Sequence, residues 1–252
     1  MQLVIDLGNT NLKAGIFSDS VLKRKNNFAE LARPVLLFPQ VDPETLQEIL
    51  NKNPEIDSCI LSSVIEYPRS VDTFLSKRLK YIRFSSRTPV PVKNHYQSPH
   101  TLGNDRIASA VAAHTLFPNS AALVITMGTC ITYDLVTRNG EYKGGGISPG
   151  MQMRFSSLHT FTSQLPLIEY TPGLQIPVPG TDTRGSMISG VIHGIIAEIE
   201  GISALYKKVY PSIQVILSGG DMNYFANRLK INIFVHPNLV IYGLQKILEF
   251  NV

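Results

Sequence analysis

The stretch VIDLGNTNLKAGIF, residues 4–17, places a polar turn between two apolar runs. The residues of the turn are Asp6, Leu7, Gly8, Asn9, Thr10 and Asn11, and Lys13 follows just beyond them. A simple β-hairpin needs only a two-residue turn such as Asn-Gly. Backbone N–H groups of a glycine-containing turn can converge on an anion, and Thr and Asn side chains add further donors. Either an ordinary turn with a hydrogen-bonded Asp or one half of a phosphate-binding clamp therefore fits this stretch.

The composition indicates a folded protein without targeting or disulfide features. The chain has 252 residues, of which 44% are hydrophobic and 17% charged, and its formal net charge is +4. Its two cysteines, Cys59 and Cys130, lie in separate apolar segments, which favours a reducing compartment. The six histidines show no metal-ligand spacing. Neither a signal-peptide pattern nor a charge-free apolar stretch of membrane-spanning length occurs. We expect a cytoplasmic protein that does not bind membranes.

One dense basic run, Lys23-Arg24-Lys25, follows the turn-forming pair Asp19-Ser20. Such a run can contact nucleic acid, but neither aromatic residues nor a basic helical stripe accompanies it. We interpret it as a solvated hairpin edge and expect no nucleic-acid partner.

The first half of the chain alternates strand and helix patterns. Strands are predicted at residues 3–5, 12–17, 34–38, 57–65 and 81–86, and helices at 42–52, 69–79 and 103–117. Asp42 is the expected N-cap of the first helix, with Pro43 in its first turn. The same order then begins again after residue 119, with AALVITMGTCITYDLV, EYKGGGISPG, helices at 151–166 and 183–209, the strand IQVILSGGD and a final helix LVIYGLQKILEF.

The repeated order predicts two similar halves. Placing Gly128 on Gly8 aligns the turn at residues 6–10 with the turn at 126–130. This arrangement resembles the actin, hexokinase and Hsp70 superfamily. That resemblance implies an α/β fold of two ribonuclease-H-like domains, residues 1–115 and 116–252, each a mixed sheet flanked by helices, with a nucleotide cleft between them.

A second motif, LGNDRIASAVAA, leads from a loop into a helix. The plain interpretation is a helix N-terminus at which Asp105 complements the helix dipole and Arg106 forms a surface ion pair. Further on, YKGGGISPGMQMRFSSLHTFTSQLP and TDTRGSMISGVIHGI follow in order. Together with DLGNTNLK and GTCITYD, these motifs make the chain similar to type III pantothenate kinases from residue 3 to about residue 248.

This resemblance implies roles for particular residues. Asp105 corresponds to the catalytic base. Residues that correspond to contacts with pantothenate are Tyr96, Gly103, Asn104, Asp105, Arg106 and Thr183. Residues that correspond to contacts with ATP and its phosphates are Asp6, Gly8, Asn9, Thr10, Asn11, Lys13, Gly128, Thr129 and Cys130. Asp6 would hold Mg²⁺ directly or through water. The family also implies a homodimer whose partner subunit covers part of the pantothenate site.

Two positions depart from the family pattern. The second hairpin of the family normally begins with an Asp that is associated with K⁺ or NH₄⁺, and this chain has Thr126 there. A Thr hydroxyl offers an oxygen but no charge. Asn104 stands where the family more often has Ala. The sequence therefore predicts ATP, Mg²⁺ and pantothenate as ligands and leaves the need for a monovalent cation open.

Three functions fit these residues. The favoured one is phosphorylation of pantothenate to 4'-phosphopantothenate in coenzyme A biosynthesis, with Asp105 accepting the proton of the attacking hydroxyl. The second is a related kinase that acts on another small molecule. The third is a non-catalytic regulator of the transcription accessory factor type, which binds nucleotide or pantothenate without turnover. Glu198 and Glu200, on the predicted helix at 183–209, are assigned to a solvated face.

Overall fold

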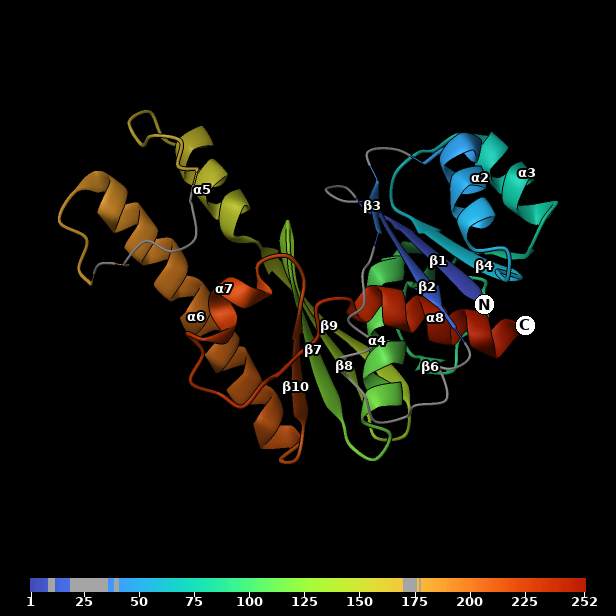
Figure 1. Cartoon of the computed structure of the whole chain (residues 1–252). Helices are drawn as coiled ribbons and strands as arrows, with labels where there is room; N and C mark the ends of the chain where they lie inside the picture. Colours follow the sequence, from blue (N-terminus) through green and yellow to red (C-terminus); the bar gives the residue numbers. More distant parts are fainter. Residues whose placement is uncertain (9–11, 19–35, 39–40, 170–175, 177) are drawn as a thin grey trace. The chain divides into compact units, whose positions relative to one another are not determined.

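The structure is a computed structural model that describes residues 1–8, 12–18, 36–38, 41–169, 176 and 178–252 (Figure 1). Its contacts divide the chain into two compact units. Unit 1 comprises Met1–Pro118, Val136–Lys143 and Asn238–Val252, and unit 2 comprises Asn119–Leu135 and Gly144–Pro237. Each unit is described by itself below. The division into domains at residues 115 and 116 stays a prediction.

Unit 1 is built on a five-stranded mixed sheet. Its strands are β1 (Gln2–Leu7), β2 (Leu12–Phe17), β3 (Leu36–Phe38), β4 (Ser58–Ser63) and β5 (Lys80–Arg83), in the order β3-β2-β1-β4-β5. Strand β1 is antiparallel to β2 and parallel to β4, which is in turn parallel to β5. The carboxyl ends of β1, β4 and β5 therefore meet at one edge of the sheet.

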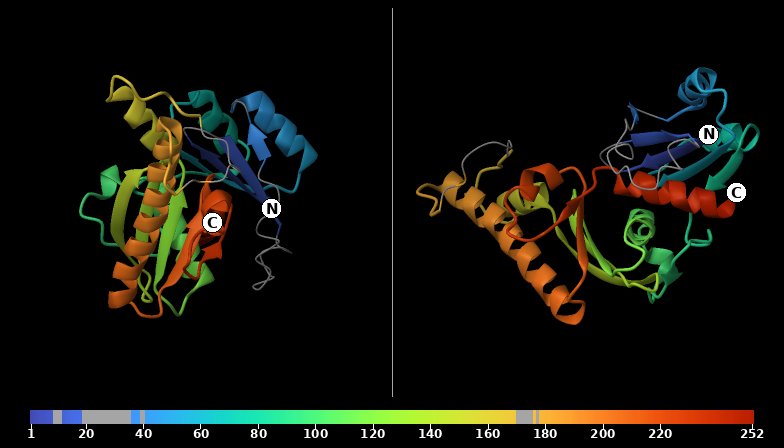
Figure 2. Two further views of the ribbon diagram at one scale, coloured as in Figure 1. Left: turned by 90° about the vertical axis from the view of Figure 1, so that its left-hand side faces the viewer. Right: turned by 60° about the horizontal axis from the view of Figure 1, so that its bottom comes forward.

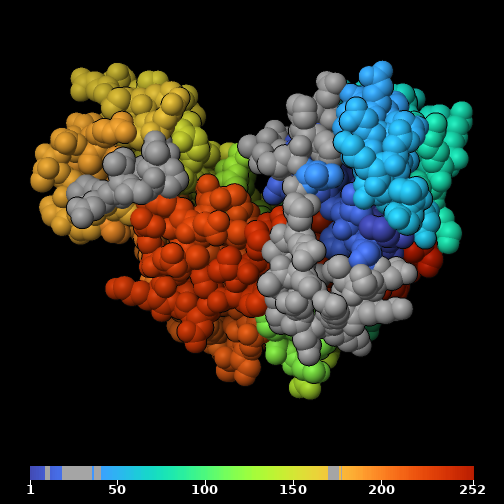
Figure 3. Space-filling view, viewed as in Figure 1, coloured from blue at the N-terminus to red at the C-terminus, as the bar shows by residue number. Residues whose placement is uncertain are grey.

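Helices α2 (Pro43–Lys52) and α3 (Arg69–Ser76) cover one face of this sheet, and Figure 3 shows them together on one exposed side of unit 1. Leu46 and Leu75 belong to the same buried cluster as the β1 residues Leu3 and Ile5. Helix α2 starts as the sequence predicts, because the Asp42 side chain accepts a hydrogen bond from the Thr45 N–H at 2.7 Å.

Helices α4 (Asn104–Leu116) and α8 (Leu239–Asn251) pack against each other in unit 1 (Figure 2). Their backbones approach so closely at Gly243 that a Cβ there would lie 1.9 Å from the carbonyl oxygen of Ala108. The Ala-rich body of α4 permits this approach. Helix α8 also contacts β1 and β4, so the end of the chain belongs to unit 1 rather than unit 2.

The second sheet has six strands in the order β11-β10-β7-β8-β9-β6. Their bounds are β6 (Lys93–Asn94), β7 (Ala122–Met127), β8 (Cys130–Val136), β9 (Glu141–Pro149), β10 (Gln214–Ser218) and β11 (Phe234–Val235). Read from β9, five of these strands follow β9-β8-β7-β10-β11, the same relative order as in unit 1. This agreement is what two similar halves of the sequence predict. Strands β6 and β11 are too short to show a periodic pattern and were not predicted.

Helices α5 (Met151–Thr160), α6 (Thr183–Val209) and α7 (Met222–Ala226) complete unit 2, and α6 lies along one face of the sheet (Figure 2). Ile188, Ile192, Ile195 and Ile199 of α6 are buried against β7, β8 and β10. The prediction that α5 continues to Pro166 is wrong. The hydroxyl of Thr162 donates to the Leu158 carbonyl oxygen at 2.7 Å and takes the acceptor that a continuing helix would use.

Helix α6 is the one helix of the described residues that is long and apolar enough to cross a membrane by length and composition. A core helix passes the same test, and this helix contributes seven buried residues to unit 2. It therefore gives only weak evidence for a membrane span.

Candidate active site

Two carboxylates of unit 1 lie close enough to influence each other. Asp6 is on β1, with Lys13 of β2 and Ser62 of β4 as its register partners. Burial, followed by the negative charge of Asp105, raises the pKa of Asp6 to about 6, and Lys13 and Ser62 offset part of this rise. A cation beside Asp6 would offset the repulsion between the two carboxylates. Asp6 could therefore hold a cation such as Mg²⁺.

Asp105 lies in the first turn of α4, two residues after the N-cap residue Gly103. Its Oδ1 accepts a hydrogen bond from the Arg106 N–H at 3.0 Å. A Cβ on Gly103 would lie 2.5 Å from the same Oδ1, so the glycine makes room for the carboxylate. The plain interpretation of Asp105 as a helix-dipole partner is compatible with this position, and so is a role as a base near Asp6.

Arg106 and Tyr96, two predicted substrate contacts, come together in unit 1. The Arg106 guanidinium carbon lies 5.6 Å from the centre of the Tyr96 ring, and Tyr96 in turn lies 6.2 Å from Tyr142. Arg106 is only 6% exposed, so the interpretation as a surface ion pair is wrong. A buried guanidinium beside an aromatic ring is suited to binding an anionic or strongly polar ligand.

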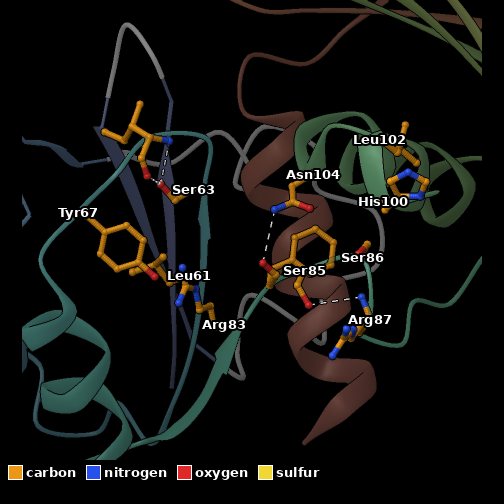
Figure 4. A pocket seen from close by; sticks show the side chains of 12 residues that line it. Leu61, Ser63, Tyr67, Arg83, Ser85, Ser86, Arg87, His100, Leu102 and Asn104 are labelled. Carbon is orange, nitrogen blue, oxygen red and sulfur yellow. Dashed lines mark hydrogen bonds between the residues drawn. The ribbon is translucent and has the colours of Figure 1, made fainter. Parts of the chain in front are cut away.

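A cavity of about 540 Å³ opens at the carboxyl edge of the unit 1 sheet (Figure 4). It is lined by the ends of β4 and β5, the turn that follows β5, and the segment that leads into α4. Asn104 lines the cavity, and its Nδ2 donates to the Phe84 carbonyl oxygen at 3.4 Å. This volume is in the range of small-ligand sites. Sequence analysis missed the arginines of this cavity, although the position of Arg87 directly after the predicted strand at 81–86 could have indicated it.

The second hairpin, at Gly128 and Thr129 in unit 2, is enclosed by glycines of two other motifs. The Gly150 N–H donates to the Thr129 carbonyl oxygen at 3.0 Å, and a Cβ on Gly150 would lie 2.0 Å from the Gly128 carbonyl oxygen. Gly219 has φ +95°, and a Cβ there would lie 2.1 Å from the Met127 carbonyl oxygen. Gly128 itself has open space where a Cβ would be, as a turn that receives a ligand requires. Cys130, the first residue of β8, is a half-buried free cysteine.

The last residues of β7 and β10 in the second sheet include hydroxyl side chains, whereas β1 of the first sheet carries Asp6. Thr126 and Ser218 are register partners on β7 and β10. Asp221 follows β10, and burial raises its pKa. Within the described parts of the chain, no group of three or more His, Cys, Asp or Glu residues could hold a metal ion.

Thr183, the remaining predicted substrate contact, lies at the start of α6 beside a second cavity of about 900 Å³ in unit 2. The Asp182 side chain caps this helix by accepting from the Gly185 N–H at 2.6 Å. Arg154 of α5 also lines the cavity. Sequence analysis did not single out Arg154, although it lies within the quoted motif YKGGGISPGMQMRFSSLHTFTSQLP.

The assignment of Glu198 to a solvated face is wrong. Its carboxylate accepts hydrogen bonds from Tyr133 at 2.8 Å and from Ser148 and Arg154 at 2.5 Å each. Burial raises the pKa of Glu198, but these hydrogen bonds outweigh burial and leave the pKa below its ordinary value. The ionised Glu198 therefore fixes Arg154 at the cavity. Glu200 is also bonded, because it accepts from the Lys230 N–H at 2.6 Å.

Some predicted residues lie outside the described part of the chain. They are the turn residues Asn9, Thr10 and Asn11 and the basic run Lys23-Arg24-Lys25. Gly8 and Lys13, on either side of the turn, are described.

The fold of the chain can be compared with that of solved structures, and this comparison identifies a structural class. The chain is similar in structure to a putative N-acetylglucosamine kinase from Porphyromonas gingivalis, with TM-score 0.52, 14% identity and full coverage of both chains. It is also similar to a conserved putative Baf family transcriptional activator from Campylobacter jejuni, with TM-score 0.61, 18% identity and coverage of 99% and 98%. The fold is thus that of the actin-like ATPases and related kinases, with two ribonuclease-H-like halves.

The sequence identifies the family within this class. A sequence model of type III pantothenate kinases matches residues 2–205. The type III pantothenate kinase of Bacteroides fragilis is 40% identical over 252 residues, which cover 100% of this chain and 98% of the relative. The chain belongs to the type III pantothenate kinase family.

Proposed function

We propose that this protein transfers the γ-phosphoryl group of ATP to the primary hydroxyl of pantothenate, forming 4'-phosphopantothenate in the first step of coenzyme A biosynthesis. The observation that carries this proposal is the Asp6–Asp105 carboxylate pair, which lies in the same unit as the Arg106–Tyr96 contact. One carboxylate of such a pair can bind a cation while the other accepts a proton.

Asp105 is the general base. Phosphoryl transfer passes through a loose transition state, so the protein contributes mainly alignment and neutralisation of charge. Asp105 accepts the proton of the hydroxyl as the oxygen attacks phosphorus in line. General-base catalysis of this kind contributes about 10²–10⁴-fold. Arg106 and Tyr96 orient pantothenate, and Gly103 leaves space for the carboxylate.

Charge on the transferring group is neutralised from both hairpins. Lys13, paired in register with Asp6, reaches the phosphates as a point charge. Asp6 would hold Mg²⁺, which would supply electrostatic stabilisation of the phosphate oxygens. Backbone amides at Gly8 and Thr129 act as donors. Thr183 contacts pantothenate, and Thr126 offers a hydroxyl oxygen where the family has its cation-associated Asp.

The remaining assignments follow from family membership. We infer that the protein is a cytoplasmic homodimer whose partner subunit covers part of the pantothenate site, and that it binds neither nucleic acid nor membranes. The large exposed apolar side chains Phe161 and Val178, in the part of unit 2 that also carries Thr183, support a protein–protein contact there.

The test is an assay of ATP-dependent phosphorylation of pantothenate by the purified protein, in sodium buffer and again with K⁺ or NH₄⁺. Turnover in either buffer is the expected result. Turnover of a different acceptor, but not of pantothenate, would identify another small-molecule kinase. Ligand binding without any turnover would favour a regulator, the alternative that the uncharged Thr126 raises.

A further inference from the structure

Glu198 of α6 is the centre of a hydrogen-bond network that joins three other elements of unit 2. Its Oε1 accepts from the Tyr133 hydroxyl of β8 at 2.8 Å and from the Ser148 hydroxyl of β9 at 2.5 Å. Its Oε2 pairs with the guanidinium of Arg154 on α5. The side chains of Arg154 and Glu198 are only 20% and 23% exposed. Since both carboxylate oxygens are bonded, the network holds β9 and α5 against α6.

Arg154 extends this network to the turn between β9 and α5. Helix α5 follows β9 and packs against α6 (Figure 1). The Nε of Arg154 donates to the Pro149 carbonyl oxygen at 2.8 Å, and its Nη2 donates to the Ser148 hydroxyl at 3.4 Å. Its backbone N–H donates to the Gly150 carbonyl oxygen at 3.0 Å, in the first turn of the helix. One arginine therefore holds three consecutive residues of the turn.

Gly150 is the residue of this turn that contacts the second hairpin. It is buried, and its N–H donates to the Thr129 carbonyl oxygen at 3.0 Å. The approach is so close that a Cβ on Gly150 would lie 2.0 Å from the Gly128 carbonyl oxygen. Backbones packed at this distance cannot move independently, because there is no free space between them. A displacement of the turn therefore displaces the hairpin or breaks its hydrogen bond to Gly150.

We propose that Glu198 and Arg154 are positioning residues for ATP, which hold the turn between β9 and α5 against the second hairpin and keep the hairpin in the conformation that binds phosphate. This inference rests on the proposed function, since it takes the second hairpin as a phosphate-binding element. Both side chains act through Gly150. Their charges matter because a charge-assisted hydrogen bond is shorter and stronger than a neutral one.

A role in stability alone predicts a different result, namely a less stable protein with unchanged affinity for ATP. The test is therefore the Kd for ATP with Mg²⁺, measured by calorimetry in the absence of pantothenate. Glu198→Gln keeps the size of the side chain and removes its charge, so we expect the Kd to rise about 10-fold. Glu198→Asp keeps the charge and shortens the side chain, and the Kd rises less.

A double-mutant cycle tests whether the two residues act together. Arg154→Met removes the guanidinium and keeps a long side chain. If Glu198 acts on the hairpin through Arg154, the double variant binds ATP about as weakly as the weaker single variant. Hydrogen exchange of the Gly150 amide is the structural measurement, and it becomes faster in both single variants because the turn opens more often. Additive changes in Kd, or unchanged exchange at Gly150, would overturn the proposal.

The matched control is Glu200→Gln, on the same helix. Glu200 also accepts a hydrogen bond, but its donor is the Lys230 N–H, in the segment between α7 and β11. This variant is expected to lose stability without a change in the Kd for ATP or in exchange at Gly150. Equal effects of Glu198→Gln and Glu200→Gln on the Kd would show that general destabilisation is the cause.

The same measurements separate this inference from the proposed function. If the wild type binds ATP but does not phosphorylate pantothenate, the proposed function fails, and the ratio of the two Kd values still decides the positioning role. If the wild type phosphorylates pantothenate and Glu198→Gln binds ATP with unchanged affinity, the kinase stands and the positioning role falls. Absence of ATP binding by the wild type would overturn both.

Discussion

The carboxyl edges of the two sheets share a strand order but differ in charge. The unit 1 edge combines Asp6, Lys13 and Asp105, and burial together with the neighbouring carboxylate perturbs the pKa of Asp6. The corresponding edge of unit 2 has Thr126 and Ser218, and a hairpin that two glycines enclose. A strand order depends on many apolar residues, whereas the chemistry of an edge depends on a few. The two halves could therefore diverge in function without a change of fold.

The largest expected effect tests the charged edge. Asp105→Asn keeps the size of the side chain and removes its basicity, so turnover falls by about 10²–10⁴-fold. Binding of ATP and pantothenate, measured by calorimetry, is retained. Unchanged turnover with intact binding would remove the assignment of Asp105 as the base.

Asp6→Asn is expected to change the free energy of unfolding and the enzymatic activity of the protein in opposite directions. The folded protein holds the proton of Asp6 more tightly than the unfolded chain does, because the pKa rises from 3.8 to about 6. Ionisation of Asp6 therefore costs stability as the pH rises through this window, and the full cost is present above pH 6. In the absence of ligands and Mg²⁺, Asp6→Asn raises the free energy of unfolding at pH 7.5 by up to about 3 kcal/mol. At pH 3.5 it has little effect.

Ionisation of Asp6 lowers stability but is required for activity. Since the ionised carboxylate is needed to bind Mg²⁺, kcat/KM of the wild type falls below about pH 6. Asp6→Asn loses Mg²⁺-dependent turnover. Denaturant titrations at the two pH values check the stability, and equal changes at both would contradict the assigned pKa.

Gly150→Ala tests the second hairpin. The added methyl group would lie 2.0 Å from the Gly128 carbonyl oxygen, so the hairpin must shift. We expect a loss of about 1–3 kcal/mol in the free energy of unfolding, and a higher KM for ATP because the displaced hairpin binds phosphate. The matched control is Gly201→Ala, inside α6, where the added Cβ would meet none of the neighbouring atoms within 4 Å. It gains up to about 1 kcal/mol. Similar outcomes for the two variants would show that the hairpin is not tightly enclosed.

The smallest expected effect concerns Thr126 of the second hairpin, where the family has a charged Asp. Thr126→Asp introduces a carboxylate at the second hairpin, next to the register partner Ser218. Turnover of the wild type is expected to be insensitive to exchange of Na⁺ for K⁺, and Thr126→Asp to become several-fold faster in K⁺. Thr126→Asn, which adds an amide without charge, stays insensitive. Activation of the wild type by K⁺ would mean that Thr126 still supports a cation site.

The sequence by itself determined the elements and the repeated plan. Helix α6 spans Thr183–Val209, the predicted residues, because its apolar side chains recur every three to four positions. Asp42 caps α2 as its residue type and the following Pro43 predict. The matching strand orders of the two sheets follow from the restart of the sequence pattern. The helix and its cap depend on residues that are close together in the chain, and the repeated plan depends on the repeated pattern.

The tertiary structure decided which distant residues meet. Asp6 and Asp105 are far apart in the sequence, and only folding brings their charges together. The same holds for Glu198, which accepts hydrogen bonds from three other elements of unit 2, and for α8, which packs on α4 through Gly243. Arg87 looks like an ordinary turn residue until β4, β5 and Asn104 surround its cavity. Periodicity reports which face of an element is buried but not which partner buries it, so these contacts had no signal in one sequence.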